Sequence, residues 1–513
     1  MTFLEERDMS AVPSIKEYYK GKTIFITGGS GFMGKVLIEK LLYSCTDLER
    51  IYLLLRSKRG VSPEERLTSL YRSPCFDRLR SEKPGIFETK ISVICGDVAE
   101  IGLGLSVEDR MLLIKNVNIV YHVAASVRFD DRLDYAAKLN LRGTKQMIDL
   151  AHEMCHLESF VHVSTSYSNT NKECIDEVLY PAHADWRETL SVCETIDSRD
   201  LEILTLKYIG QLPNTYVFTK QLAEHVVSEQ RGKLPIVIIR PSIVISAYEE
   251  PIPGWNENFN GPVGIFIAIG KGLLRTVYGD ENLIADYIPV DLAIKHIIAA
   301  AWIRGSKKLE SIDDIPIYNC CAGKLKTITG KGLGKISLKI VNEVPVNDNI
   351  WGCSDSVTTN NFWYFLSVLL FHLLPAVIID TVLKLLGKQP RLVKIQRRIY
   401  NVFIALQCFT TQQWTFINKN FVKLRSCIKN CDKTEFYYDL ENIQYSKLMR
   451  NNALGARRYI LNEKDEDIPK ARAHFKIMKI CQTTSHFIFY GLLIWWMLTS
   501  EILQDYLQKI MFN

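Results

Sequence analysis

The sequence predicts an α/β protein with a doubly wound parallel sheet, followed by a smaller, helical C-terminal domain. Short apolar runs alternate with helical segments from residue 22 to residue 240, as in parallel sheets whose strands are joined by crossover helices. A glycine-rich turn follows the first of these runs. Between residues 385 and 460, apolar residues recur at three- and four-residue spacing, which is typical of amphipathic helices. A chain of 513 residues is long enough for two or more domains.

The glycine-rich turn lies between the apolar run 22–26 and a helical segment at 35–42. Its glycines suit a tight turn, close approach by a pyrophosphate and close packing of the helix on the sheet. The helix N-terminus also offers free N–H groups to phosphates. An ordinary turn between a strand and a helix, with no ligand, would be the alternative. We expect a dinucleotide here, contacted by Thr27, Gly28, Gly31, Phe32, Met33 and Gly34.

The end of the second strand, residues 51–55, indicates which dinucleotide binds. Proteins that bind NAD usually carry Asp or Glu at this point, to accept hydrogen bonds from the ribose 2′-hydroxyl. This chain has Arg56, Ser57, Lys58 and Arg59 instead. A guanidinium at Arg56 suits a 2′-phosphate, so we expect NADPH. A solvated basic loop is the alternative.

Four further apolar runs complete the predicted sheet of six or more strands, at residues 91–95, 119–123, 160–163 and 236–239. Ligands of such sheets bind beyond the carboxyl ends of the strands. Asp97 follows the third strand, where a carboxylate accepts a hydrogen bond from the adenine amino group. Small residues around Ala124 let the cofactor pass close to the fourth strand. The further cofactor contacts that we expect at strand ends are Val98 and Pro241.

Tyr216 and Lys220 are the candidate catalytic pair. They are four residues apart in a helical segment, and therefore share one helix face. A neighbouring ammonium favours the phenolate, so we expect Lys220 to lower the pKa of Tyr216. A second pair with the same spacing, Tyr18 and Lys22, precedes the first strand and cannot serve. A hydroxyl at the end of the fifth strand would orient the substrate carbonyl, and the candidates are Ser164, Thr165 and Ser166.

With these residues in place, the chain resembles the fatty acyl-CoA reductases, membrane-associated members of the extended short-chain dehydrogenase/reductase superfamily. The resemblance covers nearly the whole chain, and the sheet is then a Rossmann sheet of the extended reductase type. Residues 455–460 resemble the family's second domain, which is named for a male-sterility protein. The other matching segments are 27–42, 51–67, 122–129, 160–169, 216–224, 240–244, 253–256, 260–262, 270–275 and 285–291. The segment 319–330 departs from the family because it lacks the usual Asn-Pro dipeptide.

The resemblance implies reduction of a long-chain acyl-CoA to a primary alcohol and CoA through a bound aldehyde, using two NADPH. It makes Tyr216 the general acid, Lys220 its pKa tuner and ribose ligand, and Thr165 the residue that orients the carbonyl. The choice of Thr165 over Ser164 and Ser166 rests on counting from the strand end. Two alternatives remain: another NADPH-dependent extended reductase acting on a sterol, an aldehyde or a sugar-like ketone, or a lipid-binding relative without turnover.

Composition argues against nucleic-acid binding, a metal site and a cleaved signal peptide. A net charge of +6 is too small to indicate nucleic-acid binding. No zinc-ligand spacing is present, because Cys427 and Cys431 stand alone, so we expect no metal. Thirteen cysteines and an N-terminus with no apolar region predict reduced thiols in the cytosol and no cleaved signal.

Two apolar segments, 363–383 and 484–504, bear on a membrane. The first contains His372, Pro375 and Asp380, which are costly in a span, so a buried, monotopic or re-entrant segment competes with a spanning one. A basic block at 384–398 would become luminal if the first segment crossed, against the positive-inside tendency. We therefore expect 484–504 to be a C-terminal anchor and 363–383 to be only a possible second membrane segment. The catalytic domain would face the cytosol, on the endoplasmic reticulum or the peroxisome.

The expected domains follow from these segments. Residues 1–20 are expected to form an N-terminal tail and 21–350 the NADP-binding reductase domain, with its substrate-binding part at about 241–345. Pro, Asn, Asp and Ser residues predict a linker near 345–360. Residues 355–475 would form the helical, membrane-proximal domain, which suits an acyl chain drawn from a bilayer; a helical lid or the surface of a homodimer is the alternative.

Overall fold

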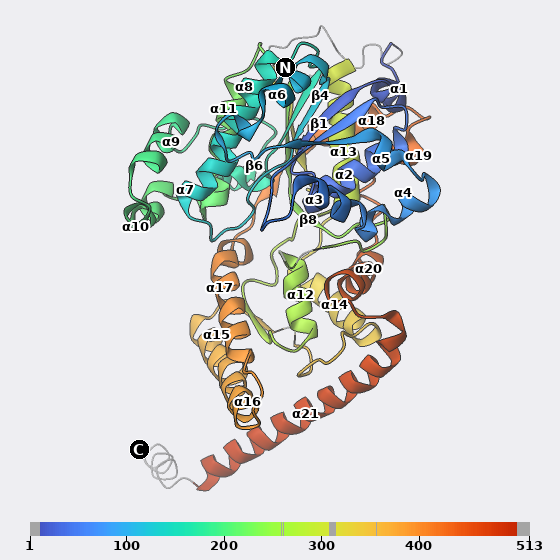
Figure 1. Ribbon diagram of the computed structural model, residues 1–513. Coiled ribbons are helices and arrows are strands. Elements are labelled where there is room, and N and C mark those ends of the chain that lie inside the picture. Colours follow the sequence, from blue (N-terminus) through green and yellow to red (C-terminus); the bar gives the residue numbers. More distant parts are fainter. Residues whose placement is uncertain (1–10, 258, 260, 307–313, 355, 500–513) are drawn as a thin grey trace.

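The computed structural model describes residues 11–499 except 258, 260, 307–313 and 355. A large upper part contains the main sheet and its covering helices, and a smaller helical part lies below it (Figure 1). The last described helix, α21 (Ile468–Thr499), extends away from the lower part.

The main sheet has seven strands, all paired in parallel. The strand order reverses between β1 and β4, which confirms the predicted doubly wound topology. Ligands of such sheets bind at this reversal, beyond the carboxyl ends of the strands. In spatial order the strands are β11 (Ile317–Cys320), β7 (Ile236–Pro241), β5 (Ser159–Val163), β4 (Ile119–His122), β1 (Thr23–Thr27), β2 (Arg50–Leu55) and β3 (Ile91–Cys95).

Helices cover both faces of the sheet, and strand residues alternate between the two hydrophobic cores. In β1, Ile24 and Ile26 pack with helices α2 (Phe32–Ser44) and α13 (Val290–Ser306), whereas Phe25 packs on the opposite face. That face is covered by α6 (Val107–Asn116), α8 (Gly143–Glu153) and α11 (Thr215–Ser228). The other helices of the upper part are α1 (Ile15–Tyr19), α3 (Pro63–Tyr71), α4 (Asp77–Glu82), α5 (Ile86–Lys90), α7 (Leu133–Ala136), α9 (Trp186–Thr195), α10 (Ser198–Ile209), α18 (Lys419–Ser426) and α19 (Lys433–Phe436).

The lower part is built from helices and one small sheet, in which β9 (Thr276–Tyr278) pairs with β12 (Ser356–Thr358). Two more strand pairs lie near its junction with the upper part: β8 (Ile243–Ile245) with β10 (Tyr287–Pro289), and β6 (Cys174–Ile175) with β13 (Thr415–Phe416). The helices are α12 (Pro262–Gly270), α14 (Gly330–Glu343), α15 (Asn361–Ser367), α16 (Leu374–Leu385), α17 (Leu392–Thr411) and α20 (Tyr445–Gly455).

The expected N-terminal tail is wrong for the residues that the structure describes. Ser14 caps α1, and the helix packs on α13 with Ile15, Tyr18 and Tyr19 buried. The hydroxyl of Tyr19 donates to the carbonyl of Ile298, 3.0 Å away. A short amphipathic segment with a good cap therefore belongs to the core. The rest of the expected tail, residues 1–10, lies outside the described residues.

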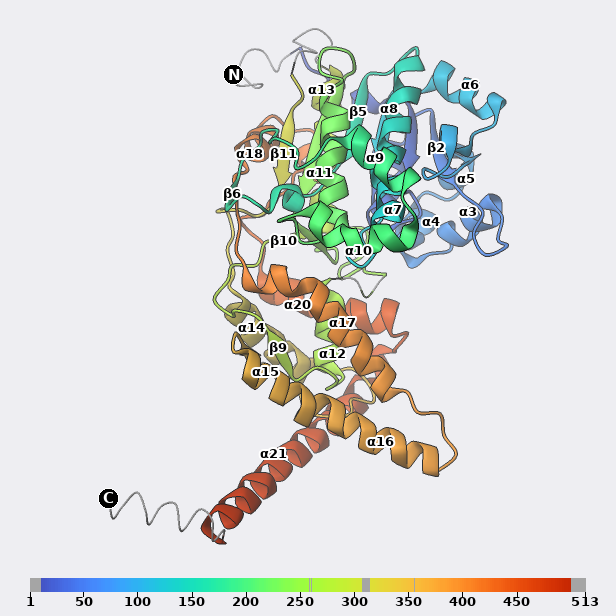
Figure 2. The same ribbon diagram turned by 90° about the vertical axis from the view of Figure 1, so that its left-hand side faces the viewer.

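The expected linker near residue 350 is not a boundary in space. Phe421, Phe436 and Leu440, from the expected C-terminal domain, are buried in the same core as the central strand β1. Conversely, α12 and α14, from the expected reductase domain, form much of the lower part (Figure 2). The chain therefore passes between the two parts several times.

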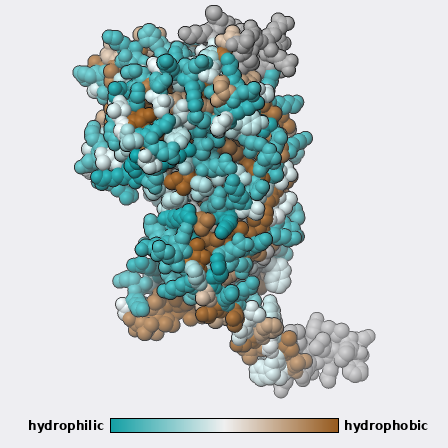
Figure 3. Space-filling view, turned by 90° about the vertical axis from the view of Figure 1, so that its right-hand side faces the viewer, coloured by the Kyte–Doolittle hydropathy of each residue, from teal (hydrophilic) through white to brown (hydrophobic). Residues whose placement is uncertain are grey.

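One helix among the described residues is long and apolar enough to cross a membrane, and it is Asn361–Leu385. It combines α15, a π-helical turn (Val368–Leu373) and α16, and its most apolar 18-residue window is 17% buried. The expected anchor at 484–504 is described only as far as Thr499, within α21. Figure 3 shows hydrophobic side chains gathered at the lower end of the molecule.

Candidate active site

The turn after β1 forms a cradle at the carboxyl edge of the sheet. Gly28 has φ +75°, and a Cβ there would lie 2.6 Å from the backbone nitrogen of Ala124. A Cβ on Gly34 would lie 2.3 Å from the carbonyl oxygen of Gly28. Both positions therefore require glycine. Helix α2 begins directly after Gly31 and has no side-chain cap, so its first N–H groups are available to an anion.

A cleft of about 620 Å³, the polar cleft, lies beside this turn. It runs from the basic end of β2 past β4 to the start of α11. Thr27 and the alternative hydroxyl candidate Ser166 do not line it. The side chain of Thr27 is buried below the turn, with Oγ1 2.8 Å from His122 Nδ1. The expected residues that do line it are Gly28, Gly31, Phe32, Met33, Gly34, Arg56, Asp97, Val98, Ala124, Thr165, Tyr216, Lys220 and Pro241.

The basic end of the polar cleft contains a residue that was not predicted from the sequence. Arg66, on α3, donates to Ser30 Oγ at 3.1 Å and to the carbonyl of Arg56 at 2.6 Å. Arg56 itself donates to Asp97 at 2.8 Å, and this hydrogen bond raises the pKa of Arg56. Two guanidinium groups, with Lys58, thus face the end of the glycine turn. Arg66 comes only ten residues after Arg56 in the sequence, but it reaches the glycine turn only because α3 folds back toward it.

Tyr216, Lys220 and Thr165 meet in the middle of the cleft. Asn214 caps α11, so that Tyr216 lies in its first turn. Burial raises the pKa of Tyr216 to about 12, and a hydrogen bond with Thr165 opposes this shift. Lys220 Nζ donates to the carbonyl of Val163 at 2.7 Å, and burial lowers the pKa of Lys220 to about 8.

The expected lowering of the Tyr216 pKa by Lys220 is not found. The four-residue spacing puts both side chains on one face of α11, as predicted, but the ammonium reaches across to the end of β5. Tyr216 is therefore protonated at neutral pH, and Lys220, with a pKa of about 8, is still mostly charged.

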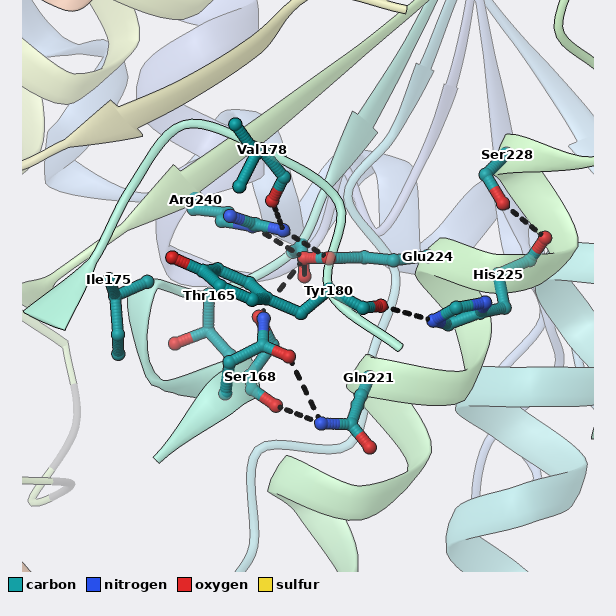
Figure 4. Close-up of polar contacts among 12 residues, drawn as sticks. Thr165, Ser168, Ile175, Val178, Tyr180, Gln221, Glu224, His225, Ser228 and Arg240 are labelled. Carbon is teal, nitrogen blue, oxygen red and sulfur yellow. Dashed lines mark hydrogen bonds and ion pairs between the residues drawn. The ribbon is translucent and has the colours of Figure 1, made fainter. Parts of the chain in front are cut away.

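A buried ion pair below the site holds the loop that carries Thr165 (Figure 4). Arg240 donates to both carboxylate oxygens of Glu224, at 2.9 and 2.7 Å, and the two side chains are almost fully buried. Glu224 also accepts hydrogen bonds from the hydroxyls of Ser164 and Ser168. Arg240 reaches further, to the carbonyl of Val178. One charge pair on α11 and β7 therefore fixes the chain on both sides of Thr165.

The hydroxyls of the two residues that flank Thr165 are engaged in buried hydrogen bonds. Ser164 donates to Glu224 at 2.5 Å, and Ser166 donates to the carbonyl of Arg240 at 2.6 Å. Thr165 Oγ1 accepts from the backbone N–H of Tyr167 at 3.2 Å, and it keeps its contact with Tyr216 in the cleft. Thr165 thus differs from its neighbours in facing the tyrosine.

A second cavity, the apolar cavity, adjoins the polar cleft. It has a volume of about 350 Å³ and is lined mainly by aliphatic and aromatic side chains of α12, α14, α20 and the end of α17. The residues that line both spaces are Tyr167, Ile243, Pro262, Val263 and Phe409.

Aromatic rings mark the junction between the two spaces. The ring of Phe129 stacks on Phe409, with 5.2 Å between centroids, and lies 5.9 Å from the ring of Tyr216. Phe409 comes from α17, more than 190 residues after Tyr216 in the sequence. The sequence did not predict this residue, because no local pattern links the last turn of α17 to the sheet edge.

Among the described residues, no group of His, Cys, Asp and Glu is arranged to hold a metal ion. The glycine turn, the uncapped helix and the basic residues beyond β2 instead define a dinucleotide site, and Tyr216 and Thr165 place two hydroxyl groups beside it. This combination defines the class of the protein as a Rossmann-fold reductase.

Comparisons with known proteins narrow the class. Two family models described as "Male sterility protein" match residues 26–297 and 371–463. Fatty acyl-CoA reductase 1 of Homo sapiens is 38% identical over 91% of this chain and 90% of its own length. Fatty acyl-CoA reductase wat of Drosophila melanogaster is 35% identical over 95% of this chain and 93% of its own. The chain belongs to the fatty acyl-CoA reductase family.

Solved structures support the fold alone. The reductase domain of a nonribosomal peptide synthetase from Mycobacterium tuberculosis is 18% identical, with a TM-score of 0.59 over 88% of this chain and 95% of that one. The terminal R domain of the myxalamid biosynthetic pathway is also 18% identical, with a TM-score of 0.56 over 89% of this chain and 95% of that domain. Both matches extend beyond the main sheet into the lower part of the molecule.

Proposed function

We propose that this protein reduces long-chain acyl-CoA to a primary alcohol and CoA, with NADPH as the electron donor. The observation that supports this best is the junction of the two spaces: a proton-donating tyrosine in the polar cleft lies beside an apolar cavity. A thioester at Tyr216 would place its acyl chain in that cavity.

The residues of the polar cleft fit a dinucleotide phosphate. The N–H groups at the start of α2 suit the pyrophosphate, and Arg56, Lys58 and Arg66 suit a 2′-phosphate. Asp97 holds Arg56 in place, in addition to any contact with adenine. When bound, the nicotinamide supplies the hydride, and two NADPH are consumed for each alcohol.

Each polar side chain at the centre has a distinct task. Tyr216 donates a proton to the oxygen of the substrate, and its raised pKa keeps it in the protonated form that a reduction needs. Thr165 hydrogen-bonds the same oxygen and orients the carbonyl. Lys220, held by the carbonyl of Val163, binds the nicotinamide ribose. With a pKa of about 8, it carries a positive charge at neutral pH.

The substrate chemistry requires two reductions. The first converts the thioester carbonyl into a hemithioacetal, whose carbon–sulfur bond breaks to give an aldehyde and CoA. The second adds a hydride to the aldehyde carbon and a proton from Tyr216 to its oxygen. The Phe129 and Phe409 rings at the junction shield the aldehyde from water between the two steps.

We further infer that the catalytic part faces the cytosol and that the C-terminal segment 484–504 anchors the chain. The aromatic-rich run within α21 and the lysines at 476 and 479 that precede it support this orientation.

A product analysis tests the proposal. Microsomes containing the full chain are incubated with a panel of acyl-CoAs and either NADPH or NADH, and products are identified by mass. We expect fatty alcohol and free CoA, with NADPH preferred. Conversion of sterols or free aldehydes without conversion of acyl-CoA would favour another extended reductase. Binding of acyl-CoA with no product would favour a lipid-binding relative.

A further inference from the structure

The helix Asn361–Leu385 has two unlike faces. Four residues along its length are buried, namely Tyr364, His372, Ala376 and Asp380. The opposite side is apolar and exposed: Leu369 is 53% exposed, Ile378 54% and Leu385 82%. Two of the three residues that count against a spanning helix here, His372 and Asp380, therefore lie on the buried face.

Contacts bind this buried face to the protein from end to end. Near the start, the ring of Tyr364 lies 5.3 Å from that of Tyr278 on β9. In the middle, His372 Nε2 accepts a hydrogen bond from the backbone N–H of Arg275 at 3.0 Å. Toward the end, Asp380 accepts hydrogen bonds from the first three N–H groups of the chain entering α17, at 2.9–3.0 Å.

The capping by Asp380 makes α16 and α17 a hairpin, because it ties the start of one helix to the side of the other. The two helices pack along each other, and their link at 386–391 forms the tip (Figures 1 and 2). Helix α17 has exposed cations in its first two turns, at Lys394, Arg397 and Arg398. If α15–α16 crossed a bilayer, α17 would enter it too and bring these cations to the hydrocarbon region, where charge is strongly disfavoured.

We propose that α15–α16 lies in the plane of a membrane surface, with its exposed apolar face among the lipid acyl chains, and does not cross. Three features of the molecule select a lipid surface as the occupant. The exposed side chains form a continuous apolar face at the lower end of the molecule (Figure 3). Basic residues at the hairpin tip, Lys384, Lys388 and Arg391, match anionic headgroups. Helix α21 leaves the molecule at the same end, with Phe487 and Trp495 exposed.

This placement also brings the apolar cavity close to the membrane. Leu274 and Arg275 line the cavity, and Arg275 is the residue whose backbone contacts His372. At the other end of the hairpin, Phe409 of α17 reaches the junction with the polar cleft. A docked hairpin therefore holds the substrate cavity directly above the lipid surface.

Topology gives the first test. A cleavage site for a specific protease, flanked by short Gly-Ser arms, is inserted after Gly387 at the hairpin tip of the full chain, in sealed microsomes. We expect cleavage by added protease without detergent. As a control, the same insertion is made after Gly85, in an exposed turn of the reductase part. It should be cut equally with and without detergent. Cleavage at the hairpin tip only after detergent would overturn the proposal, because the helix would then cross.

Lipid contact gives the second test. The triple variant Leu369→Glu, Ile378→Glu, Leu385→Glu keeps the buried face intact. On vesicles of phosphatidylcholine and phosphatidylserine with a photoreactive acyl chain, we expect labelling of residues 361–386 to fall about tenfold or more, because binding scales with the apolar area inserted. Reduction of a short, water-soluble acyl-CoA should be unchanged.

The matched control replaces three exposed apolar residues of the upper part, Ile101→Glu, Val107→Glu and Met111→Glu. It should leave labelling unchanged. Undiminished labelling in the hairpin variant would overturn the proposal. So would a lipid-independent dimer that this variant dissociates, because the apolar face would then bind a second copy of the chain.

Discussion

The polar cleft and the apolar cavity share a wall but are built by different means. Most residues that the sequence predicted for the cleft lie at the end of a strand or in the first two turns of the helix that follows. The cavity is assembled from α12, α14, α17 and α20, which span nearly 200 residues of sequence. Local motifs thus form the polar cleft, whereas the tertiary packing of distant segments forms the apolar cavity that we propose for the acyl chain.

The two spaces also differ in what they contribute to stability. The cleft contains buried groups that are unfavourable in a folded protein, such as Lys220, whose pKa burial lowers to about 8. In the cavity wall, each apolar group removed from water stabilises the folded state. The unfilled space of the cavity offsets part of this stabilisation. The cleft is therefore the costly region, and substitutions in the two spaces should act differently on activity and stability.

The largest effect is expected at Tyr216. The variant Tyr216→Phe keeps the ring against Phe129 and removes the proton donor, so kcat should fall about 10²-fold or more. Acyl-CoA binding should be unchanged, because the apolar cavity is intact. Rates are measured with saturating NADPH and a long-chain acyl-CoA.

Tyr18→Phe is the control for this comparison. Its hydroxyl is buried and has no hydrogen-bond partner among the described residues, on the far side of the molecule from the cleft. Removing it should leave kcat unchanged. If the two variants lost activity to the same degree, the assignment of Tyr216 as proton donor would be wrong.

The second effect, on the choice of cofactor, is expected at the basic end of the cleft. Arg56→Asp removes a charge-assisted hydrogen bond to a 2′-phosphate, worth about 1.5–3 kcal/mol, and should raise the KM for NADPH tenfold or more. Arg66→Ala should have a similar effect. The KM for NADH should change little in either variant, so the NADPH/NADH ratio is the quantity to measure. An unchanged ratio in both would exclude these arginines from cofactor selection.

The contrast between the two spaces also explains what the sequence could and could not predict. The strands, the glycine turn and the pair Tyr216–Lys220 were predictable because each depends on residues close together in the chain. Arg66 and Phe409 were not, since only tertiary packing brings them to the site. The buried helix α1 was missed for a related reason: five residues carry too little pattern, and their burial depends on α13.

A smaller effect is expected in the cavity, at Gly270. A Cβ at this position would lie 3.6 Å from Val346, an ordinary contact, so Gly270→Ala should be nearly neutral. Gly270→Leu would project further into the cavity and shorten it. Each methylene that no longer fits should cost about 1–3 kcal/mol, so kcat/KM should fall for the longest acyl-CoAs and persist for shorter ones.

The measurement is a chain-length profile of kcat/KM for the wild type and both variants. The KM for NADPH serves as the internal control and should not change, since Gly270 does not line the polar cleft. A uniform loss at all chain lengths would show that Gly270→Leu disturbs the fold, and an unchanged profile would place the acyl chain elsewhere.

The smallest effect concerns stability, at Lys220. Burial lowers its pKa from 10.5 to about 8, so the folded state binds this proton less tightly than the unfolded state. Below pH 8 both states are charged, and the folded state bears the full penalty. Between pH 8 and 10.5 the folded lysine becomes neutral while the unfolded one stays charged, so the wild type gains stability as pH rises through this window.

Lys220→Met removes that penalty together with the hydrogen bond to Val163. We expect the variant to be inactive. Without ligands it should be more stable than the wild type at pH 7, by about 1–3 kcal/mol, since each pKa unit corresponds to about 1.4 kcal/mol. The difference should shrink steadily from pH 8 to 10.5, as measured by chemical unfolding in mild detergent. Lys58→Met, at an exposed position of the same cleft, should show no such gain. If Lys220→Met were equally or less stable at pH 7, the lysine would be well accommodated, and the polar cleft would not be the costly region of the molecule.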